Sequence, residues 1–182
     1  PQLLKFFLPS RDSHAAAYYD WGSELETEWK ENYKLWMTFI NEYKNRGGRV
    51  TAGSDSGYMY NLYGFGFVQE LELLREAGFH PMEVIRAGTL HAAEAIGMED
   101  KIGTVEVGKL ADLILMDENP LKNLKYLYAT GDIKLDEEND VVRVGGVEKT
   151  IKDGIVYDAR LLLEDVKKIV DEEKSKTPDW KS

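Results

Sequence analysis

Residues 50–57 have the sequence Val-Thr-Ala-Gly-Ser-Asp-Ser-Gly, which places one acidic residue, Asp55, where an apolar segment gives way to a glycine-flanked loop. A short strand is predicted over 49–52, because its Val and Thr favour extended backbone and two glycines at 47–48 break the chain before it. The glycines on either side of Asp55 allow a tight turn. In parallel α/β proteins the chemistry lies at the carboxyl ends of strands, so Asp55 is placed to bind a metal or to accept a proton.

The same residues also fit a purely structural role for Asp55. Aspartate is common in turns, because its side chain accepts hydrogen bonds from nearby backbone N–H groups. The sequence therefore also allows Asp55 to close an Asx-turn or to cap the next helix. The residues alone do not decide between these structural roles and a catalytic role.

Composition limits the classes of partner. The chain has 182 residues, 43% of them hydrophobic, which suffices for one or two compact units. Its net charge of -10 predicts no binding to nucleic acid or to anionic membrane surfaces, since both repel an acidic surface. No cysteine is present, so disulfides and thiolate zinc sites are excluded and the cellular compartment stays open. The sequence shows neither an apolar run of transmembrane length nor a signal-peptide pattern.

A long amphipathic helix is predicted before the strand. It begins at Ser23, whose spacing from Glu26 fits a capping box, and it ends at the glycines 47–48. Its apolar residues recur every three or four positions, which favours packing against a sheet or barrel wall over a ligand-stacking surface. The stripe consists of Leu25, Trp29, Tyr33, Trp36, Ile40 and Tyr43.

The loop after Asp55 is rich in tyrosine and glycine. Tyr58, Tyr60 and Tyr63, together with Gly57, either line a substrate pocket or pack as a surface loop. The Gly-Phe-Gly run at 64–66 lacks the third glycine of a nucleotide-binding fingerprint.

Helices and then strands are expected after this loop. One helix carries Phe67, Leu71 and Leu74 and stops at Gly78, and the next extends over 81–97. The spacing of the apolar residues then changes to that of β-strands, which are predicted at 102–107 and 110–116. A final amphipathic helix at 159–174 packs either on its own sheet or on a partner chain.

An acidic cluster lies within 126–146. Its acids at 136, 138 and 140 are spaced like the start of a calcium loop, but Val141 and Val147 stand where an EF-hand needs Gly and Glu. A solvated hairpin tip is therefore predicted for 136–140.

Several ordered motifs identify a resemblance. Residues 87–97 are Ala-Gly-Thr-Leu-His-Ala-Ala-Glu-Ala-Ile-Gly, and residues 101–117 are Lys-Ile-Gly-Thr-Val-Glu-Val-Gly-Lys-Leu-Ala-Asp-Leu-Ile-Leu-Met-Asp. Asn-Pro-Leu follows at 119–121 and Ile-Lys-Asp-Gly-Ile-Val-Tyr at 151–157. This order resembles the closing portion of the amidohydrolase superfamily, in its imidazolonepropionase-like and Xaa-Pro dipeptidase-like branch. The resemblance covers 48–158, and 126–146 is an insertion relative to that pattern.

The resemblance implies an α/β fold in three parts. Residues 1–98 would form the C-terminal end of a (β/α)8 metal-dependent hydrolase barrel. Residues 99–158 would form part of a small β-sandwich, and 159–182 a helix and tail.

The resemblance also implies a role for Asp55. It matches the family's acid at the end of the eighth barrel strand, which binds a divalent metal, zinc in the expected case, and passes a proton from the attacking water to the leaving amine. The family's other ligands, a His-x-His pair, a Lys or Glu and two further His residues, have no counterpart in this chain.

The three histidines do not supply the missing ligands. His80 precedes Pro81 and is expected to lie at a helix entry, and His91 is expected within a helix. His14 lies in a polar segment in which nothing orients it toward a metal. We therefore expect a metal in a full-length enzyme and no tightly bound metal in this chain alone.

A complete (β/α)8 barrel needs about 250 residues. The expectation is therefore a C-terminal fragment, inactive alone, of an enzyme that hydrolyses amide or cyclic amide C–N bonds of small or dipeptide-like substrates. Unpaired strand edges and apolar faces predict a homo-oligomer or a companion chain. The alternative is a noncatalytic binding or scaffold module that retains the fold.

Overall fold

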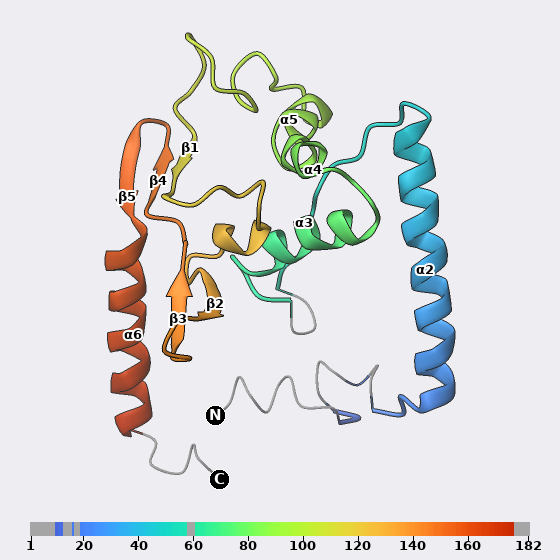
Figure 1. Cartoon of the computed structure of the whole chain (residues 1–182), viewed down its shortest axis with the longest axis horizontal. Coiled ribbons are helices and arrows are strands. Elements are labelled where there is room, and N and C mark those ends of the chain that lie inside the picture. The colour runs from blue at the N-terminus through green and yellow to red at the C-terminus, as the bar shows by residue number, and fades with distance from the viewer. Residues whose placement is uncertain (1–9, 13–15, 17–18, 58–60, 177–182) are drawn as a thin grey trace.

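The computed structural model describes residues 10–12, 16, 19–57 and 61–176, which form a mixed helix and strand structure. Two long helices, α2 (Ser23–Asn45) and α6 (Ala159–Lys176), stand at opposite edges, with short helices and strands between them (Figure 1). Among the described residues, no helix is both long and apolar enough to cross a membrane.

Helix α2 begins at Ser23 as predicted, but its cap differs from the prediction. Gly22 is the N-cap residue and makes no side-chain cap, and Ser23 is already helical. The carbonyl of Ser23 accepts a hydrogen bond from Thr27 Oγ1 at 2.8 Å. The predicted capping box of Ser23 and Glu26 is therefore wrong, because the helix begins one residue too early for Ser23 to cap it. The predicted end is confirmed, since α2 stops at Asn45 and Gly47 takes φ of 87°.

Only part of the apolar stripe of α2 is packed. Met37 and Ile40 lie against the core, and the Tyr33 hydroxyl donates to Glu76 Oε2 at 2.7 Å. Trp29 and Trp36 are 56% and 60% exposed, and α2 has no fully buried residue. Exposed apolar faces are expected where the barrel is incomplete, and packing of the whole stripe against a barrel wall stays a prediction.

The core lies between α3 (Gly66–Glu76), α4 (Pro81–Ala87) and the 3-10 helix η2 (Leu124–Leu127). The predicted helix ending before Gly78 is confirmed by α3. The residues of this core cluster are Leu71, Leu74, Ala77, Phe79, Val84, Ala87 and Leu124.

The predicted single helix over 81–97 is interrupted. α4 ends at Ala87, and α5 (Leu90–Ala95) begins after Thr89, whose φ of -130° and ψ of -87° are not helical. A Cβ at Gly88 would lie 3.0 Å from Phe67 Cζ and 3.2 Å from Leu71 Cδ2. The break therefore lies where the backbone approaches α3 closely.

Two antiparallel sheets follow. One has the order β1-β4-β5, formed by Leu113–Leu115, Lys149–Lys152 and Ile155–Asp158, with Leu113 opposite Ile151. The other is the hairpin of β2 (Asp132–Leu135) and β3 (Val141–Val144), whose turn carries the acidic cluster as predicted. In this turn the Asp136 carboxylate accepts the backbone N–H of Asp140 at 2.8 Å.

The predicted strand over 102–107 is wrong. Gly103 takes φ of 94°, and a Cβ there would meet the side chain of Ala93, so this segment turns against α5. Within 110–116 only β1 is a strand. Every strand pair in the described residues is antiparallel, so these residues do not themselves contain parallel barrel strands.

The predicted C-terminal helix is confirmed as α6. Asp158 Oδ1 accepts the backbone N–H groups of Arg160 at 3.0 Å and Leu161 at 3.1 Å, which caps the helix start. α6 contacts β4 and β5 and has no buried residue along its length.

An ion pair ties α2 to α4 and generates a pH prediction. Glu83 Oε2 accepts Lys44 Nζ at 2.9 Å and the backbone N–H of His80 at 2.8 Å. These hydrogen bonds lower the pKa of Glu83, with Lys44 the larger cause. Because the folded pKa is lowered, the stabilisation is present above about pH 4.3 and is lost as pH falls through the folded pKa.

Replacing Glu83 with Gln should lower the free energy of unfolding at neutral pH by about 0.5–1 kcal/mol, a small effect because the side chain is partly exposed and solvent screens it. The difference from the parent chain should shrink below about pH 4. Urea unfolding followed by circular dichroism measures both. Glu42→Gln is the matched control, because in the described part of the chain Glu42 forms a weaker ion pair, with Arg46 at 3.7 Å on the exposed side of α2. Equal losses for both variants would contradict the assignment.

Candidate functional site

The segment that leads to Asp55 rests on the short helices. Ala52 N–H donates to the Ala87 carbonyl at 3.1 Å, and His91 Nδ1 lies 3.2 Å from the Val50 carbonyl oxygen. Arg49 Nη1 also pairs with Glu94 Oε2 at 2.8 Å. The predicted strand over 49–52 is therefore wrong as a strand, because its backbone bonds a helix end and pairs with no strand among the described residues.

Asp55 stands exposed at the end of this segment. Its φ of 45° is in the left-handed region, which Asp adopts more readily than most residues. No hydrogen bond or ion pair joins its carboxylate to another described residue. Phe65, not Asp55, is the N-cap residue of α3. Neither an Asx-turn nor a helix cap by Asp55 is formed within the described residues, from which 58–60 are missing.

Polar side chains around Asp55 hold the loop in place. Ser54 Oγ and Ser56 Oγ lie 2.7 Å apart, Asn61 Nδ2 donates to the Ser54 carbonyl, and Gly57 N–H donates to the Asn61 carbonyl at 2.7 Å. These bonds join the two arms of the loop just before α3. Sequence analysis missed Ser54, Ser56 and Asn61 as positioning residues. The available signal was a hydroxyl residue on each side of Asp55, because Ser and Asn commonly bond nearby backbone in turns.

The structure brings together two of the predicted substrate residues. Gly57 takes φ of 106°, which favours glycine, and a Cβ at this position would meet the hydroxyl of Tyr63. The Tyr63 side chain is 78% exposed. Tyr58 and Tyr60 lie outside the described residues, and a substrate pocket lined by these tyrosines stays a prediction.

Two of the three histidines have structural positions. His80 is the N-cap of α4, as expected for a helix entry, and His91 on α5 is partly buried. His14 lies outside the described residues. In the described part of the chain, no three His, Cys, Asp or Glu residues are grouped to hold a metal ion. The described donor set therefore does not complete a metal centre, and the role of Asp55 as a ligand stays a prediction.

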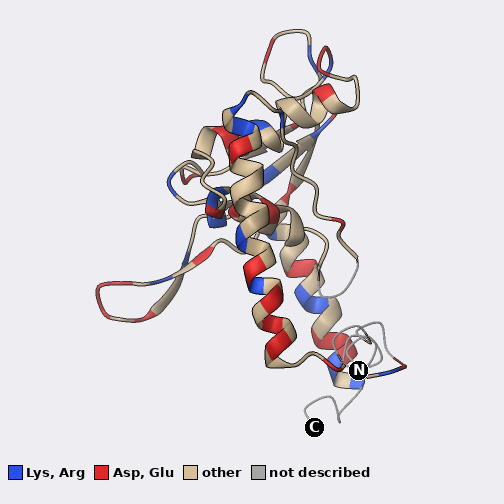
Figure 2. Cartoon of the chain, turned by 90° about the vertical axis from the view of Figure 1, so that its right-hand side faces the viewer, with Lys and Arg blue, Asp and Glu red and all other residues tan. Residues whose placement is uncertain are grey.

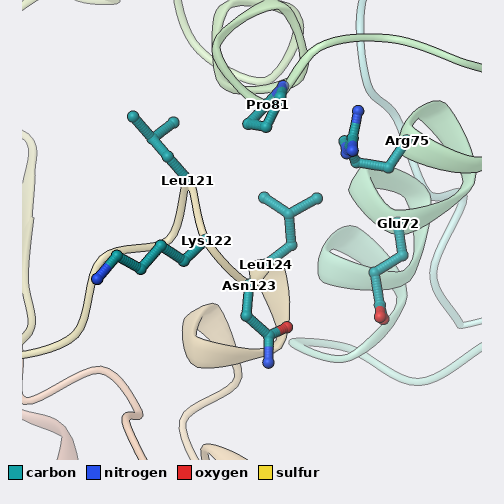
Figure 3. A pocket seen from close by; sticks show the side chains of 7 residues that line it. All are labelled: Glu72, Arg75, Pro81, Leu121, Lys122, Asn123 and Leu124. Atoms are coloured by element: carbon teal, nitrogen blue, oxygen red, sulfur yellow. The ribbon is translucent and has the colours of Figure 1, made fainter.

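A pocket of about 240 Å³ lies between α3, the start of α4 and residues 121–124 (Figure 3). Its acid and its arginine are engaged within the protein. Glu72 Oε2 accepts the Tyr128 hydroxyl at 2.8 Å, and Arg75 Nη1 donates to the Phe79 carbonyl. Burial and the bond to Glu72 raise the pKa of Tyr128 to about 12. Figure 3 shows Lys122 extending away from Glu72 and Arg75. This pocket therefore offers no convergent reactive groups.

Comparison with known proteins defines the class. The model of the amidohydrolase family matches residues 36–156, and the chain belongs to this family. Its relatives include an imidazolonepropionase of Symbiobacterium thermophilum, 40% identical over 75 residues, which are 38% of this chain and 16% of that protein. A 5'-deoxyadenosine deaminase of Methanobrevibacter smithii is 44% identical over 52 residues, covering 29% of this chain and 12% of that protein. The aligned part thus spans less than a fifth of each relative.

Solved structures agree with this family. A Xaa-Pro dipeptidase with methionine bound in its active site matches with a TM-score of 0.50 and 28% identity, over 67% of this chain and 25% of its own. A putative prolidase from Bifidobacterium longum matches with a TM-score of 0.52 and 29% identity, over 64% of this chain and 25% of its own. The family and its hydrolase members support a hydrolase function.

The single ligand position predicts weak zinc binding. Zinc sites in proteins use at least three protein ligands, so calorimetric titration of the purified chain with zinc should show no binding at micromolar affinity or tighter. Asp55→Ala is the control variant. Tight binding that this variant leaves unchanged would reveal another site, with His14 the first residue to replace.

Proposed function

We propose that this chain is the C-terminal part of a metal-dependent amidohydrolase that hydrolyses amide or cyclic amide C–N bonds, with Asp55 as metal ligand and general base. The observation that carries the proposal is the exposed Asp55 carboxylate, which has no partner among the described residues and lies within the region that matches the family. A turn or cap role would require hydrogen bonds that Asp55 does not make there.

The remaining ligands of this centre come from residues outside the described part of the chain. The proposal rests on the family match and on the short aligned share of each relative, 16% of the imidazolonepropionase and 25% of the Xaa-Pro dipeptidase. In such a centre a divalent metal, zinc in our proposal, supplies a bound water with a pKa near neutrality.

Asp55 has two tasks in the proposed reaction. As a carboxylate it accepts the proton that the attacking water loses, and it then delivers this proton to the nitrogen of the broken C–N bond. The hydrogen bonds of Ser54, Ser56 and Asn61 hold the loop so that Asp55 stays exposed at one position. A rigid backbone around the base limits the loss of alignment between Asp55 and the water.

The proposed substrates are small amides or dipeptide-like molecules. The named relatives include a Xaa-Pro dipeptidase and imidazolonepropionases, which supports this class. We place Gly57 and Tyr63, with Tyr58 and Tyr60, beside the substrate, because aromatic rings with hydroxyl tips suit a partly apolar ligand.

We further propose barrel residues at 1–98, sandwich residues at 99–158 and an appended helix and tail at 159–182. In this arrangement the exposed side of α2 packs against a companion chain, another copy of this chain or further residues of the enzyme. A hollow of about 300 Å³ on this side is lined by Leu35, Trp36 and Phe39. Exposed apolar surface of this kind marks contact sites.

The test is Asp55→Asn in the full-length enzyme. Asn keeps the size and one oxygen of Asp but cannot accept the water's proton, so turnover should fall at least about a hundredfold, the usual scale for loss of a general base. The Michaelis constant should change much less. Steady-state kinetics on an amide or dipeptide substrate of the parent enzyme measures both.

Asp153→Asn is the matched control. Asp153 is also an exposed aspartate with positive φ, 49°, but it lies in the turn between β4 and β5. Its replacement should leave turnover unchanged. Near-normal turnover of the Asp55→Asn enzyme would show that Asp55 is a turn residue, and it would contradict the proposed mechanism.

A further inference from the structure

One residue, Asn61, bonds the chain on both sides of Asp55. Its Nδ2 donates to the Ser54 carbonyl, directly before Asp55, and its backbone carbonyl accepts the Gly57 N–H at 2.7 Å. Ser56 Oγ donates to Asn61 Oδ1 at 3.4 Å. Both polar atoms of the amide therefore have partners of the matching kind, and Asp55 lies between residues that Asn61 holds.

The backbone of Asp55 needs such support. Its φ of 45° lies in the left-handed region, which is less favourable for a residue with a Cβ. Residues in this region persist where the surrounding structure holds them, and they gather at active sites. Charged side chains lie along the long helices (Figure 2), and none of the ion pairs found in the described part of the chain includes Asp55. The support therefore comes from the polar bonds of the loop.

Asn61 is itself anchored on α3. The carbonyl of the next residue, Leu62, accepts the N–H groups of Phe65 at 3.2 Å and of Gly66 at 2.8 Å. Gly66 is the first residue of α3 and is buried, and a Cβ there would meet Asn61 Oδ1 and Ser56 Oγ. The amide of Asn61 thus occupies the space that a side chain at 66 would fill. Its position depends on a glycine at the start of the helix.

We propose that Asn61 is a positioning residue for the hydrolytic reaction, which holds Asp55 in the left-handed conformation and so keeps its carboxylate aligned with the attacking water. This inference rests on the proposed function. Without the amide, the backbone of Asp55 would relax to a more favourable φ and would direct the carboxylate elsewhere. A base must lie within hydrogen-bond reach of the proton that it accepts, so misalignment lowers turnover more than substrate binding.

The first test uses this chain and needs no activity. Asn61→Ala removes both side-chain bonds of the amide, so hydrogen exchange of the Gly57 N–H, followed by NMR, should become at least about tenfold faster. The Ala52 N–H, which donates to the Ala87 carbonyl, is the internal reference and should exchange as in the parent chain. An unchanged rate at Gly57 would show that the amide does not hold the loop.

A second variant displaces the amide and leaves Asn61 itself intact. Gly66→Ala places a methyl group where the Asn61 amide lies, so the amide should move out and exchange at Gly57 should again be faster. Alanine is a better helix former than glycine, so circular dichroism should show no loss of helix. Faster exchange without loss of helix separates the effect of the amide from a loss of fold. Parent-like exchange in this variant would contradict the proposal.

Kinetics of the full-length enzyme test the role in catalysis. Asn61→Ala should lower turnover at least about tenfold and change the Michaelis constant less than about threefold. In the Asp55→Asn background the same substitution should lower turnover less than about twofold, because Asn61 acts only through Asp55. Asn123→Ala is the matched control. Asn123 Nδ2 also joins two segments, by donating to Asp132 Oδ2 at 2.7 Å, but it lies at the start of η2, and its loss should leave turnover unchanged.

The outcomes distinguish this inference from the proposed function. Near-normal turnover of Asp55→Asn would contradict the proposed function, and with it any base for Asn61 to position. Normal turnover of Asn61→Ala beside an impaired Asp55→Asn would overturn the inference alone. Equal losses from Asn61→Ala in both backgrounds would also overturn it, since they would show a structural role that does not act through Asp55.

Discussion

The packing of α3 against α4 is the contact on which the rest of the structure depends. Val84 is fully buried and Phe79 is 2% exposed, so these side chains occupy the centre of the one core cluster found in the described residues. Leu124 of η2 joins the same cluster and so ties the second half of the chain to the first. A residue removed from this cluster would loosen both halves, because buried apolar contacts of this kind contribute most of the folding free energy.

The same packing positions the candidate site. Ala87, at the end of α4, is fully buried and its carbonyl accepts the N–H of Ala52, three residues before Asp55. The loop then turns back through Asn61 into α3. Asp55 is therefore held at a fixed place by backbone bonds and by its neighbours' side chains, while its own carboxylate is left out of these bonds. This arrangement favours the role that we propose for Asp55, because a carboxylate already bonded within the protein would first have to release its partner.

The sequence predicted the regular elements and the family better than their packing. The boundaries of α2, α3 and α6 followed from glycine positions and from helical spacing, and the hairpin turn at 136–140 followed from its polar residues. The strands predicted at 49–52 and 102–107 failed, because a strand exists only where a neighbour pairs with it, and local propensity does not report the neighbour. The helix predicted over 81–97 failed for a similar reason, since the close approach of Gly88 to α3 is a tertiary contact.

For the site, the sequence by itself determined that one carboxylate lies between glycines within the family's closing motifs, and that no cysteine and few histidines accompany it. Only the tertiary structure decided that Asp55 makes no turn or cap bond to any residue that the structure describes, that Tyr63 lies against Gly57, and that Trp29, Trp36 and one face of α6 are exposed. The physical reason is that composition and spacing depend on neighbours along the chain, whereas burial and hydrogen bonding depend on neighbours in space.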